Sequence, residues 1–244
     1  TILHRTANSV LWLLTGTPEA NERLQDLAEQ AGIARNRLIF APRKPNPEHL
    51  ARYPLADVFL DTAPYGAHTT ASDAMWMGVP VVTVPGRSFA SRVCGSLVTA
   101  AGMGELVCPT VAAYIAKAIE LCTDAGKAVH LKSRLTEYRD SCTLFNTPGL
   151  VRNLERLYRQ MWSDYAEGNL HRPDLSNLEL LHEVGCEINV EAMLGPLGSD
   201  QRPLYRKKLA ERGAFTALRH DPRLYERSEV RAPASRQNVP SHAG

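Results

Sequence analysis

His68, Thr69 and Thr70 form the run in this sequence whose side chains are best suited to binding an anion. They stand at the predicted start of a helix, where unpaired backbone N–H groups and the positive end of the helix dipole attract negative charge. An imidazole and two hydroxyl groups beside those N–H groups suit a pyrophosphate. A structural interpretation is equally open, because Thr69 or Thr70 can cap the helix. The run from Thr70 to Asp73 resembles a capping box with Asp in place of Glu.

The elements around this run predict how it is positioned. Residues 58–60 are a short apolar run typical of a buried strand, and residues 61–67 form a loop that contains Pro and Gly. The helix then ends at Gly78, with Pro80 just beyond, and residues 81–84 predict the next strand. In a strand–loop–helix–strand unit of this kind, ligands bind where the helix begins at the carboxyl end of the first strand.

The same alternation runs through most of the chain. Further strands are predicted at 10–14, 37–40 and 106–107, and further helices at 17–32, 47–52, 88–101, 110–121, 128–142 and 148–165. Strands that alternate with helices in this way predict an α/β fold with a doubly wound parallel sheet. Thr17 and Thr110 are predicted helix caps. The strongly amphipathic helix 148–165 is expected to pack on the core.

Composition excludes several classes of protein. With 244 residues, 44% of them hydrophobic, the chain can build a packed core. A net charge of +2 points to no particular partner, and no apolar run approaches the roughly 20 residues that cross a bilayer. The five cysteines form no C-x-x-C pair, and the histidines show no H-E-x-x-H spacing. We therefore expect reduced thiols, a cytoplasmic location and no metal site.

Residues 169–244 differ in character from residues 1–168, and we expect a separate tail there with a short helix at 175–181. Between 202 and 236 the tail carries ten basic and four acidic residues. A basic tail can contact nucleic acid or acidic lipid. A solvated helix with a loose end is the favoured interpretation, so we expect neither a nucleic-acid nor a membrane partner. The last twelve residues are expected to be disordered.

Several longer runs carry a resemblance to a known family. They are LDTAPYGAHTTASDAMWMGVPVVTVPG followed by SFASRV, the upstream runs NSVLWLL and RLIFAPRKPNPEHLARY, and the downstream run LFNTPGLVRNLERLYRQMW. These runs resemble the O-GlcNAc transferase and SPINDLY family of glycosyltransferases over roughly residues 2 to 168, in one unbroken order, which is far more specific than a lone glycine motif. The resemblance implies the Rossmann-like C-terminal half of a GT-B glycosyltransferase, which would place the nucleotide-sugar-binding domain at 1–168.

The resemblance implies a role for each polar residue at the helix start. His68, Thr69 and Thr70 match the residues that hold the phosphates of the nucleotide sugar in this family. Asp73 matches the acid that holds the ribose hydroxyls, and a carboxylate is a reasonable clamp for two neighbouring hydroxyls. Helix capping is the alternative role for Asp73.

The nucleotide base, by the same resemblance, lies against the loop after the second strand. That loop contributes Arg43 and Lys44, mainly through backbone groups, and His49 follows on the short helix. Without the family, these three would be ordinary solvated side chains. The sequence also departs from the animal enzymes, which carry a lysine at the position of Asn46 and a small cysteine at that of Tyr65. Because the cysteine borders the N-acetyl group of the sugar, Tyr65 would reshape that pocket.

Two absences bear on the mechanism that the resemblance implies. The sequence has no D-x-D motif, and its central unit has no counterpart of the glutamate pair of retaining GT-B enzymes. Both agree with an inverting transfer that uses no metal and no cofactor beyond the donor substrate, a UDP-sugar. The catalytic residues are unknown and expected upstream of Thr1. They would lie in a missing N-terminal half, which helical repeats often precede.

The function that the resemblance implies is transfer of N-acetylglucosamine from UDP-GlcNAc to a Ser or Thr hydroxyl of a protein acceptor, with inversion. The isolated chain is expected to be inactive. GDP-fucose is an alternative donor, because plant SPINDLY relatives use it. Two other functions stay open, namely a nucleotide-sugar epimerase of the GT-B fold and a nucleotide-binding fragment without turnover.

Overall fold

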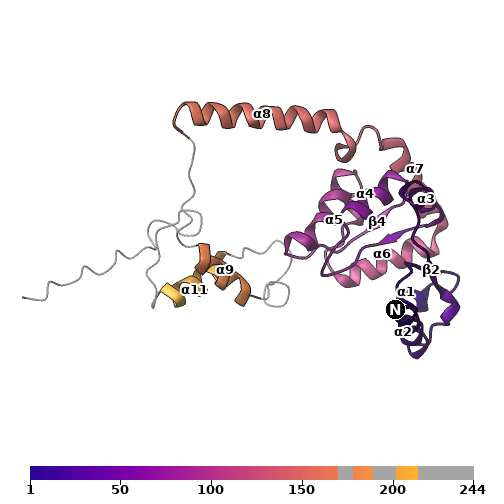
Figure 1. The fold of residues 1–244 in the computed structure, drawn as a ribbon. Coiled ribbons are helices and arrows are strands. Elements are labelled where there is room, and N and C mark those ends of the chain that lie inside the picture. The colour runs from indigo at the N-terminus through magenta and orange to yellow at the C-terminus, as the bar shows by residue number, and fades with distance from the viewer. Residues whose placement is uncertain (170–177, 189–201, 214–244) are drawn as a thin grey trace, which may run out of the picture. The chain divides into compact units, whose positions relative to one another are not determined.

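The computed structural model describes residues 1–169, 178–188 and 202–213 (Figure 1). The chain divides into two compact units, Thr1–Leu157 and Tyr158–Gly244, which are described separately. One helix, α8 (Thr147–Ala166), crosses the division. The domain boundary expected at residue 168 stays a prediction.

The N-terminal part of the first unit contains a parallel strand pair. β1 (Leu11–Leu14) pairs with β2 (Leu38–Ala41), and α2 (Pro18–Gln30) connects them. The predicted cap of α2 is confirmed, because the Thr17 hydroxyl accepts a hydrogen bond from the Ala20 N–H at 3.3 Å. Short helical turns complete this part of the chain: α1 (Ile2–Arg5), Arg35–Arg37, α3 (Asn46–Ala51) and Tyr53–Leu55.

A second parallel pair follows, and it contains the predicted strand–loop–helix–strand unit. β3 (Phe59–Leu60) pairs with β4 (Val81–Val82), and α4 (Thr69–Trp76) lies between them in the sequence. The helix ends as predicted, since Gly78 adopts a φ of 80°, which a residue with a Cβ rarely does. The predicted α/β class is confirmed, although the described strands form two separate pairs.

The strand predicted at 106–107 is wrong in detail. Residues Gly104–Leu106 form a 3-10 turn, and Val107 alone makes a bridge to Thr83. Two hydrogen bonds support the bridge, from Thr83 N–H to the Leu106 carbonyl (3.1 Å) and from Cys108 N–H to the Thr83 carbonyl (2.8 Å). The turn uses the residues that a longer strand would need.

The core of this unit surrounds β4 and α4. α5 (Phe89–Ala100), α6 (Val111–Thr123) and α7 (Ala125–Tyr138) pack around them, and Figure 1 shows α4 and α5 on one side of β4 and α6 on the other. The fully buried side chains include Met75, Val82, Cys94, Val98 and Leu106. The predicted cap Thr110 is confirmed, at 3.1 Å from the Ala113 N–H.

Two helices differ from their predictions. α7 starts three residues before the predicted 128 because the Asp124 side chain caps it, accepting from the Lys127 N–H at 3.1 Å. The expectation that the helix at 148–165 packs on the core is wrong. No residue of α8 is buried, and Leu157 and Trp162 on its apolar stripe are 54% and 70% exposed. In the part of α8 that belongs to the first unit, Leu150 and Leu154 are likewise exposed.

The second unit contains a small helical pair. α9 (Leu178–Glu187) and α11 (Arg202–Gly213) share a core of Val184, Ile188 and Leu209. Arg212 joins the two helices through ion pairs with Glu183 (3.6 Å) and Glu187. The helix expected at 175–181 overlaps α9, although residues 175–177 lie outside the described residues. The expected disorder of the last twelve residues also lies outside them. No helix in the described ranges has the length and apolarity to cross a membrane.

Candidate functional site

A hollow of about 410 Å³ opens at the carboxyl end of β3. It is lined by residues 59–62 and 65–70, which belong to β3, the loop after it and the first turn of α4. The structure thus brings together four of the predicted site residues, Tyr65, His68, Thr69 and Thr70. A hollow at this place in a parallel α/β unit is where ligands usually bind.

The start of α4 leaves hydrogen-bond donors open toward this hollow. The capping role considered for Thr69 and Thr70 is wrong, because both residues are already helical and the cap position belongs to His68, whose side chain makes no cap hydrogen bond. The His68 carbonyl accepts from the N–H groups of Ala71 and Ser72. In the described part of the chain, the N–H groups of Thr69 and Thr70 have no acceptor. Two backbone donors and two exposed hydroxyls therefore face an incoming anion.

The His68 ring is held among aromatic neighbours. It stacks on Tyr65 with 5.2 Å between the ring centroids, and Phe89 meets it edge-on at 6.2 Å. Its Nε2 lies 3.4 Å from the Ala90 carbonyl oxygen. The Tyr65 side chain is 66% exposed, so its ring stands at the rim of the hollow. Phe89 was not predicted as a site residue, and only its contact with His68 places it here.

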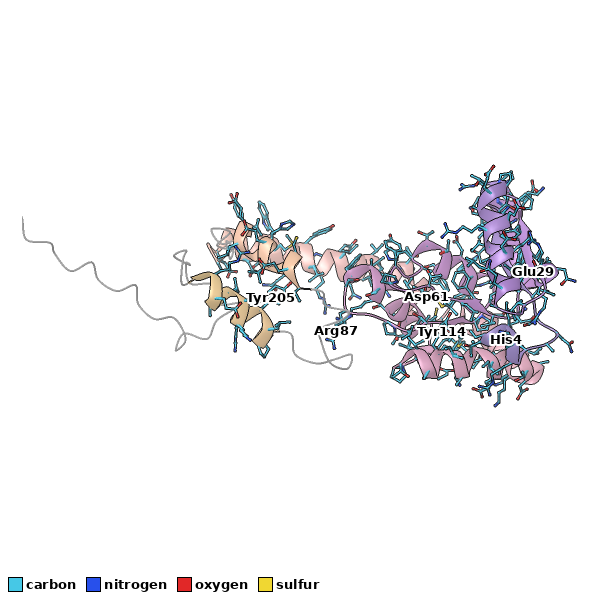
Figure 2. All side chains as sticks on the ribbon, turned by 90° about the horizontal axis from the view of Figure 1, so that it is seen from below. His4, Glu29, Asp61, Arg87, Tyr114 and Tyr205 are labelled. Atoms are coloured by element: carbon cyan, nitrogen blue, oxygen red, sulfur yellow. The ribbon has the colours of Figure 1, made fainter. Side chains whose placement is uncertain are left out.

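Asp61 is the buried polar centre beneath the loop. Its Oδ1 accepts from the N–H groups of Thr62 (2.9 Å) and Ala67 (2.7 Å), and its Oδ2 accepts from the Thr83 hydroxyl at 2.7 Å. The Tyr114 hydroxyl donates to the Asp61 carbonyl at 2.9 Å, and Figure 2 shows these two residues close together. The pKa of Tyr114 is raised to about 12, mainly by burial and to a smaller extent by the charge of Asp61. From the sequence, Asp61 was predicted only as the start of a loop.

Asp73 and His49 lie outside the lining of the hollow, and Tyr53 is a neighbour of both. His49 meets the Tyr53 ring edge-on with 5.1 Å between the centroids. Burial, and next the negative charge of Asp73, raise the pKa of the Tyr53 hydroxyl. Tyr53 thus contacts the predicted base-binding residue His49 and lies within the electrostatic reach of Asp73.

Arg52, which was not predicted as a site residue, holds the His49 ring in place. Its Nη2 and Nε lie 2.6 Å and 3.1 Å from His49 Nδ1, and its Nη1 donates to the Pro42 carbonyl at 2.7 Å. The guanidinium also lies over the Trp12 ring, 5.7 Å from its centroid. Because a guanidinium can only donate, Nδ1 is an acceptor and the ring proton is on Nε2. The sequence signal that could have identified Arg52 is its spacing, since an arginine three positions after a histidine lies on the same face of a short helix.

Arg43 and Lys44 lie at the surface. The Lys44 ammonium pairs with Glu48 at 3.0 Å, with both side chains about half exposed, and Arg43 is exposed. Neither lines the hollow. Base binding through their backbone groups stays a prediction.

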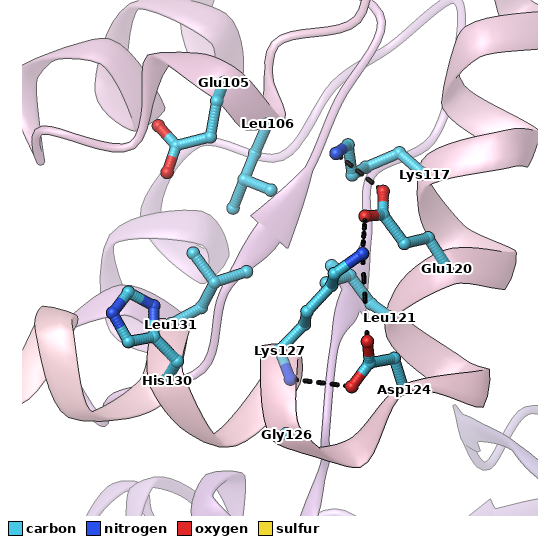
Figure 3. A pocket seen from close by; sticks show the side chains of 10 residues that line it. All are labelled: Glu105, Leu106, Lys117, Glu120, Leu121, Asp124, Gly126, Lys127, His130 and Leu131. Atoms are coloured by element: carbon cyan, nitrogen blue, oxygen red, sulfur yellow. Dashed lines mark hydrogen bonds and ion pairs between the residues drawn. The ribbon is translucent and has the colours of Figure 1, made fainter.

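A second hollow, of about 360 Å³, lies between α6, α7 and the turn at 104–106 (Figure 3). Its floor is apolar, and its rim carries charges that compensate one another. Glu120 accepts from Lys117 at 2.7 Å and from Lys127 at 2.6 Å, and these two hydrogen bonds lower the pKa of Glu120 to about 2. The rim ion pairs thus account for these charges as links between α6 and α7.

Metal binding and thiol chemistry have little support in the described ranges. No group of three His, Cys, Asp or Glu side chains there is placed to hold a metal ion. All five cysteines are free thiols. Burial, and next the charge of Asp61, raise the pKa of Cys94 to about 12, so this thiol is inert. A metal-free mechanism stays a prediction.

Comparisons with known proteins agree with the resemblance seen in the sequence. The sequence model of the protein family described as "Glycosyl transferase family 41" matches residues 1–154. An Arabidopsis thaliana protein named probable UDP-N-acetylglucosamine–peptide N-acetylglucosaminyltransferase SEC is 38% identical over 168 residues, which are 68% of this chain and 17% of that protein. A Caenorhabditis elegans UDP-N-acetylglucosamine–peptide N-acetylglucosaminyltransferase is 36% identical over 167 residues, which are 68% of this chain and 14% of that protein.

A solved structure supports the same conclusion. A mutant O-GlcNAc transferase of Thermobaculum terrenum superposes with a TM-score of 0.64 at 36% identity, covering 69% of this chain and 33% of that one. The predicted likeness is therefore confirmed. The chain spans less than a fifth of the length of the curated relatives described above.

Proposed function

Because this chain belongs to glycosyl transferase family 41, we propose that it is the nucleotide-sugar-binding part of a glycosyltransferase. The reaction we propose is transfer of N-acetylglucosamine from UDP-GlcNAc to a Ser or Thr hydroxyl of a protein, with inversion. The names of the relatives support this donor and a peptide acceptor. The acceptor side and the catalytic base belong, in this proposal, to a part of the protein upstream of Thr1.

The observation that carries the proposal is the open start of α4. The N–H groups and hydroxyls of Thr69 and Thr70 face a hollow at the carboxyl end of β3, next to the His68 ring. These donors and the helix dipole suit the diphosphate of a nucleotide sugar. In this proposal Asp73, one turn further along α4, accepts hydrogen bonds from the ribose hydroxyls.

The base subsite in this proposal is formed around His49. Arg52 fixes the ring orientation and leaves the proton on Nε2, so the ring offers one face and one donor. The backbone of the loop at Arg43 and Lys44 completes the subsite. Tyr65 borders the sugar in this proposal, and its exposed ring lies at the rim of the hollow. Because this ring would reshape the pocket for the N-acetyl group, GDP-fucose should be tested as a donor beside UDP-GlcNAc.

The chemistry follows from the charge that develops on the donor. The acceptor hydroxyl attacks the anomeric carbon from the face opposite the diphosphate, a new C–O bond forms, and the bond to the β-phosphate oxygen breaks. The hydroxyl proton passes to a base outside this chain. UDP leaves with added negative charge, which the α4 N–H groups and the two threonine hydroxyls stabilise. Because these hydrogen-bond donors are already fixed in place, they need little reorganisation when the charge develops on the leaving UDP.

The cytoplasm is the location that we propose, because free thiols persist in a reducing compartment. The test uses the full-length protein with UDP-GlcNAc or GDP-fucose and a panel of peptides. We expect release of UDP together with a peptide heavier by one N-acetylhexosamine. An epimerised sugar nucleotide with an unmodified peptide would identify an epimerase instead. Failure to bind UDP in calorimetry would overturn the proposal.

A further inference from the structure

The loop between β3 and α4 is held by a single buried carboxylate, that of Asp61. We propose that Asp61 is a positioning residue for the donor site, which holds residues 62–67 in the shape that places His68 and the first turn of α4. This inference rests on the proposed function. It assigns Asp61 no contact with the substrate.

The hydrogen bonds show how the loop is closed. Asp61 Oδ1 accepts from the N–H of Thr62, the first residue of the loop, and from that of Ala67, the last. One oxygen thus joins the two ends of the six-residue loop, and His68 follows directly. The other oxygen is anchored by the Thr83 hydroxyl on β4. Because Asp61 is only 7% exposed, water does not replace these partners at low cost.

The loop backbone also passes very close to the carboxylate. A Cβ added at Gly66 would lie 3.2 Å from Asp61 Oδ2 and 3.3 Å from the Ala90 carbonyl oxygen. The Gly66 N–H donates to the same carbonyl at 3.1 Å. The loop is therefore seated between Asp61 on one side and the start of α5 on the other, and His68 Nε2 approaches the same Ala90 carbonyl.

The charge of Asp61 has the wrong sign for a direct role beside a diphosphate. A carboxylate near the anion would repel it, and the three donors on Asp61 offset that repulsion while using its oxygens. What the site needs from Asp61 is hydrogen-bond acceptance in a fixed place. An asparagine can keep Oδ1 as the acceptor for the loop and turn its NH₂ toward the Thr83 hydroxyl oxygen, which can accept.

The experiment therefore compares Asp61→Asn with Asp61→Ala in the full-length protein. We expect Asp61→Asn to bind UDP within about threefold of wild type and to keep its kcat, because the loop remains closed. We expect Asp61→Ala, assayed where it is folded, to bind UDP at least about tenfold more weakly and to raise the KM for the donor. Hydrogen exchange of the Ala67 amide should be slow in wild type and Asp61→Asn, and fast in Asp61→Ala.

Gly66→Ala tests the packing of the loop against Asp61 without changing Asp61 itself, in case Asp61→Ala fails to fold. It should weaken UDP binding several-fold, because the added methyl group requires the loop or the carboxylate to shift by a few tenths of an ångström. Gly104→Ala is the matched control, since nothing lies within 4 Å of a Cβ there. Gly66→Ala and Gly104→Ala proteins with equal UDP affinity would overturn the proposal.

Other results would also overturn it. A folded Asp61→Ala protein with wild-type UDP affinity means that the loop needs no anchor. An Asp61→Asn protein that binds UDP normally but loses transfer means that the carboxylate takes part in the chemistry. The exchange measurement needs no ligand, so it tests the loop even if wild type binds no UDP, in which case only the proposed function fails.

Discussion

Replacing Thr70 by alanine separates ligand binding from helix stability at this site. The Thr70 hydroxyl caps nothing in the structure, because α4 has no side-chain cap. Removing it should leave the free energy of unfolding nearly unchanged. If the hydroxyl binds the diphosphate, a hydrogen bond to a charged oxygen is lost, worth about 1.5–3 kcal/mol. UDP should then bind roughly ten- to a hundredfold more weakly.

Thr110→Ala is the matched control for this prediction. The Thr110 hydroxyl does cap a helix, at 3.1 Å from the Ala113 N–H, and Thr110 lies outside the hollow. Its loss should lower the free energy of unfolding by about 1 kcal/mol. For a protein of this size that is a fall in Tm of about 2–4 °C. UDP affinity should stay at the wild-type value.

Isothermal titration with UDP and differential scanning calorimetry on the two variants give both quantities. The reasoning requires opposite patterns, namely weaker binding at constant Tm for Thr70→Ala and lower Tm at constant affinity for Thr110→Ala. A Thr70→Ala protein with a lower Tm and unchanged UDP affinity would refute it, and would restore the capping role that the structure denies.

Arg52→Gln should release the His49 ring and weaken UDP binding. The ¹⁵N NMR signals of the ring should then shift away from those of the single Nε2–H tautomer, and unchanged signals would show that Arg52 does not set the tautomer. EDTA should leave transfer by the full-length protein unchanged, and a loss reversed only by added Mg²⁺ or Mn²⁺ would contradict the proposed mechanism. The pKa of Glu120 is lowered to about 2 in the folded protein. Its ion pairs therefore stabilise the fold at any pH above the pKa that Glu120 has in the unfolded chain, and this stabilisation is lost as the pH falls toward 2. Glu120→Gln should lower Tm at pH 7 but not near pH 2. Deleting residues 170–244 should leave UDP affinity unchanged, and weaker binding would show that these residues contribute to the site.

Local sequence patterns predicted the features that depend on neighbours a few positions away. The cap at Thr17 and the helix end at Gly78 both follow from local rules, because a cap spans three residues and a positive φ depends on one. The parallel strand pair around α4 follows from apolar runs of the right length. The family could also be identified, since its motifs are long and occur in one order.

The contacts that hold the site join residues from distant parts of the sequence. Asp61 meets Thr83 across 22 positions and Tyr114 across 53, and Arg52 lies over Trp12 from 40 positions away. No periodicity connects residues so far apart. The same limit explains the helix at 148–165, whose apolar stripe predicted burial although none of its residues is buried. A pattern shows which face of a helix is apolar, but whether that face is buried depends on elements that pack against it.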